Sequence, residues 1–165
     1  AWNWTRTNTL YRCAGRRFET ILTSRPSMGL RSFIHKMTAP RPFERIPKGD
    51  MKMVFVVNHG LKMGKGKIAA QVGHGAVKAV MNAGEKRPAS LEAWLATGQK
   101  KICVKGLDAD HLIRLEQEAK QLNVLAVSVH DAGHTQIPSG SYTILALGPC
   151  EEHQLEPLTG SLKLL

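Results

Sequence analysis

Apolar residues in the last two thirds of the chain gather in short runs. The densest run, residues 53–57, is continuous, rich in β-branched side chains, and followed by the polar residues Asn58 and His59. Such a run predicts a strand that is buried on both faces. Three further apolar runs predict strands at residues 102–105, 125–129 and 142–147.

Helical spacing replaces these runs in three segments. Residues 67–81 carry apolar side chains three and four positions apart, namely Ile68, Ala69, Val72, Ala76 and Val80. A second helix is expected at 90–96 with Ser90 as its N-cap. A third is expected at 108–122 with Asp108 as its N-cap; the side chains that it turns to the core would be Leu112, Leu115 and Ala119.

The order of these elements indicates the fold class. Strands that alternate with helices predict a small α/β layer fold. The last strand follows a loop rather than a helix, so the sheet is expected to be mixed. The chain has 165 residues, which is enough for one domain with a tail. No apolar stretch approaches the roughly 20 residues of a membrane-spanning helix.

Charge is distributed unevenly along the chain. Lys and Arg number 23 against 13 Asp and Glu, for a formal net charge of +10. Residues 1–50 hold 10 basic and 3 acidic side chains, so +7 lies there and +3 in residues 51–165. An excess of positive charge favours an anionic partner, most often a nucleic acid.

The first 50 residues are expected to be an extension outside the domain of residues 51–165. They are rich in Arg, Ser and Thr, and prolines at 40, 42 and 47 indicate a linker. This composition is typical of a mitochondrial transit peptide. A disordered basic arm that contacts nucleic acid, or translated sequence without function, remains an alternative. Three cysteines without paired spacing indicate a reducing compartment, the cytosol or the mitochondrial matrix.

A glycine-rich segment, residues 60–67, joins the first strand to the first helix. Its lysines Lys62, Lys65 and Lys67 stand where backbone N–H groups and a helix N-terminus favour anions. Residues 64–69 also fit a weak dinucleotide-binding pattern, G-x-G-x-x-A. A flexible turn with solvated lysines explains the same residues.

Polar side chains recur along the first helix. Lys67, Gln71, His74 and Lys78 stand at i, i+4, i+7 and i+11, so they are expected to line one side of the helix, opposite the apolar positions. This side could be one wall of a site, or the solvated side of an amphipathic helix.

The loop at residues 131–140 follows a predicted buried strand, where α/β folds commonly carry functional groups. Asp131, His134, Thr135 and Gln136 supply a carboxylate, an imidazole, a hydroxyl and an amide, and Thr143 follows in the next strand. Asp131 could instead brace the loop without taking part in chemistry. No Ser or Cys stands in a nucleophile elbow and the histidines lack metal-ligand spacing, which disfavours a covalent or zinc mechanism.

Two long motifs at opposite ends of the domain carry a resemblance. They are LKMGKGKIAAQ at 61–71 with His74, and DAGxTQI at 131–137 with Gly140, Thr143, Gly148 and Pro149. From about residue 52 to 165 the chain resembles the archaeal and eukaryotic, type II, peptidyl-tRNA hydrolases. The resemblance implies a single compact α/β/α three-layer domain with a mixed four-stranded sheet. It also implies hydrolysis of the ester between peptide and tRNA, which recycles the tRNA in translation.

The family's catalytic roles map onto residues whose types match: Lys67, Gln71, His74, Asp131, Thr135 and Thr143. Departures occur at Asn58 and Gly60, where the family usually has Arg and Asp, at His134, where it usually has Arg, and at Gly73 and Gly75 beside His74. The resemblance implies no cofactor and no metal, and the family includes homodimers. The substrate partner would be the acceptor end of peptidyl-tRNA, in mitochondria or cytoplasm.

Our mechanistic hypothesis is that Asp131, ordered by Thr135, orients or deprotonates a water while Lys67 stabilises the oxyanion. Gln71 and His74 would position the ester; an exchange of roles between Asp131 and His74 is the main variant. Lys62, Lys65, Lys78 and His134 would contact tRNA phosphates. Two rivals are a catalytically weak RNA- or protein-binding member of the same fold and a small nucleotide-binding enzyme.

Overall fold

Four strands form a single mixed sheet in the computed structural model, which describes residues 45–131 and 138–165. These described residues belong to one of the two units into which contacts divide the chain, Pro42–Leu165. The strands are β1 (Met51–Asn58), β2 (Lys101–Gly106), β3 (Ala126–His130) and β4 (Tyr142–Glu151), in the spatial order β2-β1-β4-β3. β1 and β2 are parallel, and β4 is antiparallel to both β1 and β3. β1, β2 and β3 therefore run in the same direction, and their C-terminal ends lie at the same edge of the sheet.

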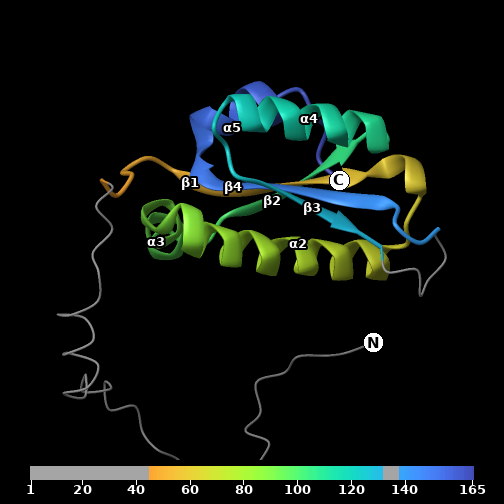
Figure 1. Ribbon diagram of the computed structural model, residues 1–165, viewed down its shortest axis with the longest axis horizontal. Coiled ribbons are helices and arrows are strands. Elements are labelled where there is room, and N and C mark those ends of the chain that lie inside the picture. The colour runs from red at the N-terminus through yellow and green to blue at the C-terminus, as the bar shows by residue number, and fades with distance from the viewer. Residues whose placement is uncertain (1–44, 132–137) are drawn as a thin grey trace, which may run out of the picture. The chain divides into compact units, whose positions relative to one another are not determined.

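Helices cover both faces of this sheet, which confirms the predicted three-layer α/β/α architecture (Figure 1). The helices α2 (Lys65–Lys86) and α3 (Pro88–Ala96) lie on one face, and α4 (Ala109–Gln121) and α5 (Glu152–Thr159) lie on the other. A short 3-10 helix, η1 (His59–Leu61), connects β1 to α2. All eight residues of β1 are buried, as its apolar run predicts for a central strand.

The helix α2 approaches the sheet along a row of small residues four positions apart. Gly75, Ala79 and Ala83 are buried, and a Cβ atom at Gly75 would lie 3.5 Å from side-chain atoms of Ile144 and Phe55. Towards its N-terminus, the same row continues through Gln71, which is buried, and Lys67. The expectation that Lys67 and Gln71 lie opposite the apolar positions is therefore wrong. Their side chains face the sheet because small residues, rather than large ones, form the central contact.

Several element boundaries differ from those expected; α2, for example, spans Lys65–Lys86 rather than residues 67–81. α3 begins at Pro88 rather than after Ser90, because proline fits the first helical position without needing a hydrogen-bond partner. β4 continues to Glu151 through the cis peptide Gly148-Pro149, and α5, which the sequence did not predict, follows it. The cap at Asp108 is confirmed, since its carboxylate accepts a hydrogen bond from the backbone N–H of His111 at 2.8 Å.

The residues after α5 return to the outer edge of β2. The backbone N–H of Lys105 donates to the carbonyl of Lys163 at 2.9 Å, and that of Leu165 donates to the carbonyl of Cys103 at 3.1 Å. Pairing of this kind covers an edge that would otherwise expose unpaired backbone groups. Within the described part of the chain, no helix has the length and apolarity needed to span a membrane.

Candidate active site

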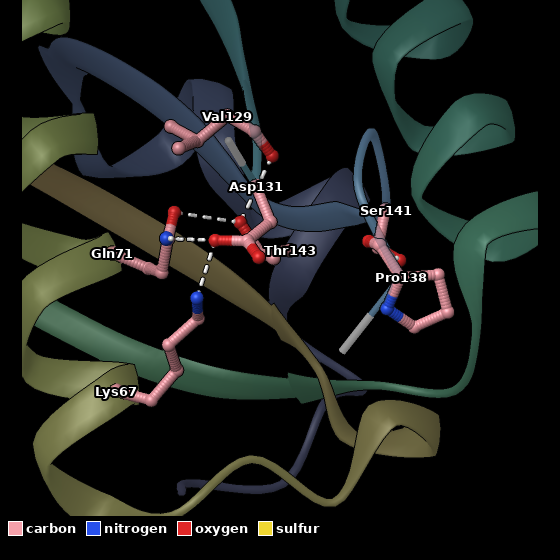
Figure 2. A network of polar contacts seen from close by, with 7 residues as sticks. All are labelled: Lys67, Gln71, Val129, Asp131, Pro138, Ser141 and Thr143. Carbon is pink, nitrogen blue, oxygen red and sulfur yellow. Dashed lines mark hydrogen bonds and ion pairs between the residues drawn. The ribbon is translucent and has the colours of Figure 1, made fainter. Parts of the chain in front are cut away.

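Four polar side chains from three separate elements meet where β3 ends and β4 begins (Figure 2). Asp131 follows the last residue of β3, and Thr143 is the second residue of β4. Lys67 and Gln71 reach toward them from the first two turns of α2. The structure thus brings together the helix motif and the loop motif, which lie about sixty residues apart in the sequence.

Hydrogen bonds connect the four side chains into one chain of contacts. The ammonium of Lys67 forms an ion pair with Oδ1 of Asp131, and Nε2 of Gln71 donates to the same oxygen at 3.2 Å. The hydroxyl of Thr143 lies 2.9 Å from Oε1 of Gln71 and 3.0 Å from the carbonyl oxygen of Val129. A hydroxyl has a single proton, so these two acceptors share it. The carboxylate of Asp131 only accepts, so it turns the NH₂ of the Gln71 amide toward itself, and the hydroxyl of Thr143 holds Oε1 of that amide on the other side.

Burial makes this arrangement electrostatically strong. The side chain of Asp131 is 5% exposed and that of Lys67 is 18% exposed, while Thr143 is fully buried. A buried carboxylate loses its hydration, and an adjacent ammonium with further hydrogen bonds compensates for that loss. Attraction between the two charges is also stronger than at an exposed site, because less water screens it. The side chains of Lys67 and Asp131 are therefore held in one relative geometry and do not sample many conformations.

Backbone hydrogen bonds fix the position of Asp131 itself. Its N–H donates to the carbonyl of Ser141 at 3.0 Å, and its carbonyl accepts from the N–H of Gly140 at 2.8 Å. These two bonds close the loop at its base, beside Pro138 and Ser141 (Figure 2). Residues 132–137 lie outside the described part of the chain, and with them the candidates His134, Thr135 and Gln136.

Other candidates on α2 stand apart from this network. His74 is exposed and makes no hydrogen bond to another described residue. Lys78 is exposed too, and its ammonium donates to the carbonyl of Ser128 in β3 at 3.0 Å. Lys62 and Lys65 carry exposed side chains in the turn before α2 and in its first residue. All four lie on elements next to the buried pair, so they remain candidates for contact with a bound substrate.

Sequence reasoning gave no role to two residues that support the start of β4. The amide of Asn58, buried at the end of β1, donates to the carbonyl of Tyr142 at 2.8 Å. On the α4 face, the Tyr142 hydroxyl donates to Glu116 at 2.9 Å, and the Tyr142 ring lies 4.7 Å from that of His130. A polar residue directly after a fully apolar strand is the signal that could have identified Asn58, because such a residue is buried and needs a partner.

The same contacts shift two pKa values. Burial of Tyr142, together with its bond to Glu116, raises the pKa of the phenol far above its ordinary value. Burial alone would raise the pKa of Glu116, but hydrogen bonds from Lys120 and Tyr142 outweigh it and hold that pKa below its usual range. The cluster therefore keeps a neutral phenol and an ionised carboxylate on the α4 side of the first residues of β4.

These groups are suited to acid–base and oxyanion chemistry. A carboxylate has about four lone-pair positions, so Asp131 can accept hydrogen bonds from Lys67 and Gln71 and still accept one from a water. The adjacent ammonium could stabilise negative charge that develops on a substrate oxygen. Among the described residues, no group of three or more His, Cys, Asp and Glu side chains is arranged to hold a metal ion.

Comparison with known proteins places this arrangement in a family. The family model described as "Peptidyl-tRNA hydrolase PTH2" matches residues 51–165. Human "Peptidyl-tRNA hydrolase 2, mitochondrial" is 44% identical over 116 residues, which cover 70% of this chain and 65% of the human protein. "Peptidyl-tRNA hydrolase" of Methanocaldococcus jannaschii is 41% identical over 115 residues, which cover 70% of this chain and 100% of the archaeal protein. The chain spans less than two thirds of the length of its human and mouse relatives. On these grounds the chain belongs to the PTH2 family of peptidyl-tRNA hydrolases.

Proposed function

We propose that this protein hydrolyses the ester bond between the peptide and the 3′ ribose oxygen of peptidyl-tRNA. The observation that carries the proposal is the buried ion pair of Lys67 and Asp131, which Gln71 and Thr143 hold at the edge of the sheet where β3 ends. Membership of the PTH2 family supports the choice of substrate. The reaction needs a positioned water, a base, and stabilisation of a tetrahedral oxyanion, and the pair offers groups for each.

Asp131 is the group that would orient and activate the water. Its carboxylate accepts the water's proton as the water oxygen attacks the ester carbonyl carbon. Lys67, in contact with the same carboxylate, then lies close enough to stabilise the oxyanion. The intermediate collapses by breaking the bond between the carbonyl carbon and the 3′ oxygen. Asp131 returns the proton to that oxygen, so the products are a free tRNA and a peptide with a carboxyl terminus.

Gln71 and Thr143 act on this step through Asp131. The Gln71 amide, held by Thr143, donates to the oxygen that also accepts from Lys67, and so fixes the plane of the carboxylate. His74, exposed on the next turn of α2, would contact the peptide or the terminal ribose. Because His74 is exposed and lies outside the network that holds Asp131, Asp131 is favoured over His74 as the base. Thr135, within residues 132–137, is proposed to order Asp131 from the loop side.

The exposed lysines would hold the tRNA itself. Lys62 and Lys65 lie at the N-terminus of α2, Lys78 lies further along α2 beside β3, and His134 follows Asp131 in the sequence. Contacts of this kind neutralise phosphates, position the acceptor end, and carry little sequence information. The affinity for tRNA is therefore expected to fall with salt.

The test is release of tRNA from a purified N-acetyl-aminoacyl-tRNA. Loss of an oxyanion donor or a general base costs roughly 100- to 1,000-fold in kcat, which is the loss expected for Lys67→Ala and Asp131→Asn. Lys86→Ala and Asp110→Asn are the matched controls, because both side chains are exposed and far along the chain from the site. Wild-type rates in Lys67→Ala and Asp131→Asn would refute the proposal. Tight tRNA binding without turnover would support instead the alternative of an RNA-binding member of the fold.

Three further properties stay predictions. Residues 1–50 are proposed to direct the protein to mitochondria, while a cytoplasmic location is the alternative. The human, mouse and bovine relatives carry the word mitochondrial in their names. A fluorescent protein fused behind residues 1–50 should enter mitochondria if they are a transit peptide. A stable domain of residues 51–165 is expected, and light scattering on it would test the predicted homodimer.

A further inference from the structure

A pocket opens on the same edge of the sheet as the candidate site, near β2 rather than β3. It is a pocket of about 640 Å³ between η1, the end of β2, the first turn of α4 and residues 161–163. Its lining includes Lys62, Lys105 and Lys163 as well as His59 and His111. Three stretches that are distant in the sequence, residues 59–62, 105–111 and 161–163, thus bring five basic side chains to one concave surface.

The basic side chains of this pocket are not neutralised by acidic side chains of the described residues. No carboxylate lines it, and none of its three lysines forms an ion pair with a described acidic side chain. Like charges held this close repel one another and raise the local potential. An anion that binds between them would relieve that repulsion.

A second pocket, at the edge of the sheet where β3 begins, is a basic surface whose charges are partly paired within the fold. It has a volume of about 520 Å³ and includes Arg87 and Lys120 in its lining. Lys120 is paired with Glu116 at 2.9 Å, and the guanidinium of Arg87 is hydrogen-bonded to the side chain of Asn123. Two of the three basic residues there, Arg87 and Lys120, therefore already have side-chain partners in the fold, and the third is Lys86.

Local structure fixes two of the basic groups. Pairing of the segment after α5 with β2 places Lys163 beside Lys105, through the backbone bond at 2.9 Å. Nδ1 of His111 accepts a hydrogen bond from the N–H of Leu107 at 3.1 Å, so its Nε2 carries the ring proton in the neutral form. His111 can therefore offer an N–H donor to a ligand without being charged. Leu107 and Leu162 add apolar surface to the lining, on which a sugar or a base could rest.

The pocket lies within reach of a substrate held at Asp131. The strand order places β2 three positions and β1 two positions from β3. Neighbouring strands are about 4.8 Å apart, which puts the pocket roughly 10–14 Å from the carboxylate along the edge of the sheet. A single strand of RNA whose terminal ribose lies at Asp131 spans that distance within a few nucleotides.

We propose that this pocket binds phosphate groups of the acceptor end of tRNA while the ester lies between Lys67 and Asp131. The inference rests on the proposed function, and it adds Lys105, Lys163 and His111 to the surface that holds the substrate. Phosphates at the pocket would anchor the RNA strand on the β2 side of the edge, while α2 holds it on the β3 side. The pocket then contributes to affinity and placement rather than to the chemical step.

The test compares two double variants of equal charge. Lys105→Ala/Lys163→Ala removes two pocket lysines, and Lys48→Ala/Lys86→Ala removes two exposed lysines from the opposite edge. Binding of uncharged tRNA is measured by fluorescence anisotropy over a range of salt, and hydrolysis of N-acetyl-aminoacyl-tRNA is followed for kcat and KM. Thermal melting of both variants should match wild type, because exposed side chains contribute little to stability.

Each phosphate contact adds about 0.7 to the slope of log Kd against log salt for a single strand, so the pocket variant should lose about 1.4 from this slope. Between about 50 and 200 mM salt, the ratio of its Kd to that of wild type should then fall about 7-fold. Its KM should rise at low salt with kcat unchanged, and the control should keep the wild-type slope. Equal slopes in the two double variants would overturn the inference. If the pocket variant shows this slope difference but the wild-type protein releases no tRNA, the proposed function is refuted and the pocket remains an RNA-binding site.

Discussion

Replacement of Thr143 by valine tests how the buried network controls the proposed reaction. Valine has nearly the same shape as threonine, so the change removes the hydroxyl without creating a cavity. The hydroxyl lies 2.9 Å from Oε1 of Gln71 and 3.0 Å from the carbonyl of Val129, and the residue is fully buried. Water cannot replace the lost donor there, so we expect the free energy of unfolding to fall by about 1–3 kcal/mol.

The effect on activity follows from the next hydrogen bond in the network. Without the hydroxyl of Thr143, Oε1 of Gln71 loses its partner, and the amide is held less firmly in its 3.2 Å bond to Asp131. A hydrogen bond to a charged group contributes about 1.5–3 kcal/mol. Its loss in the transition state would lower kcat roughly 10- to 100-fold, with KM little changed. Single-turnover hydrolysis of N-acetyl-aminoacyl-tRNA measures this directly.

Thr143→Ser is the matched control, because serine keeps the hydroxyl and loses one buried methyl group. It should lose about 1 kcal/mol of stability and keep a kcat close to that of wild type. The two variants would then be destabilised to a similar degree and differ in turnover. Equal losses of kcat in both would refute the reasoning, since packing rather than the hydroxyl would be responsible.

Three other changes test local features of the fold. The pKa of Glu116 is lower in the folded protein than in the unfolded chain, where it is about 4.3. The ionised carboxylate therefore stabilises the fold fully above about pH 4.3, and this stabilisation is lost as the pH falls through the folded pKa. Tyr142→Phe removes one hydrogen bond to Glu116, so urea titrations at acidic pH should show a smaller loss of stability. Gly73→Ala should raise the free energy of unfolding by up to about 1 kcal/mol, seen as a higher urea midpoint, because this helical glycine has open space around it. Gly60→Ala should lower the midpoint by about 1–3 kcal/mol of stability, since its Cβ would lie 2.9 Å from the carbonyl of Leu107.

The strands and most helices could be predicted because their apolar patterns are strong. The run at residues 53–57 lies inside β1, and the cap at Asp108 starts α4 as its chemistry requires. In contrast, α5 has Pro157 in its interior and no clear apolar period, so its sequence gives little helical signal. It is helical because Leu155 and Leu158 pack against the sheet, a tertiary contact that local pattern does not reveal.

The sequence names the four residues of the buried network among its candidates but does not predict their geometry, and His74, also a candidate, lies outside the network. Lys67, Gln71, Asp131 and Thr143 were all identified from motif and spacing. Their placement does not follow from the hydropathy pattern, because the large apolar residues of α2 do not mark the centre of its buried side. The centre of that side is instead the row of small residues that includes Gly75, and it carries Lys67 and Gln71 inward. A row of glycine and alanine has a weak hydropathy signal even where helix and sheet are closest.

The most direct test of the account is a double-variant cycle on the ion pair. Single-turnover rates on N-acetyl-aminoacyl-tRNA would be measured for wild type, Lys67→Ala, Asp131→Asn and the variant with both changes. Residues that act as one unit lose activity non-additively, so the double variant should be little slower than the slower single variant, at roughly 100- to 1,000-fold below wild type. A wild type that releases no tRNA, or a single variant that keeps the wild-type rate, would contradict the account.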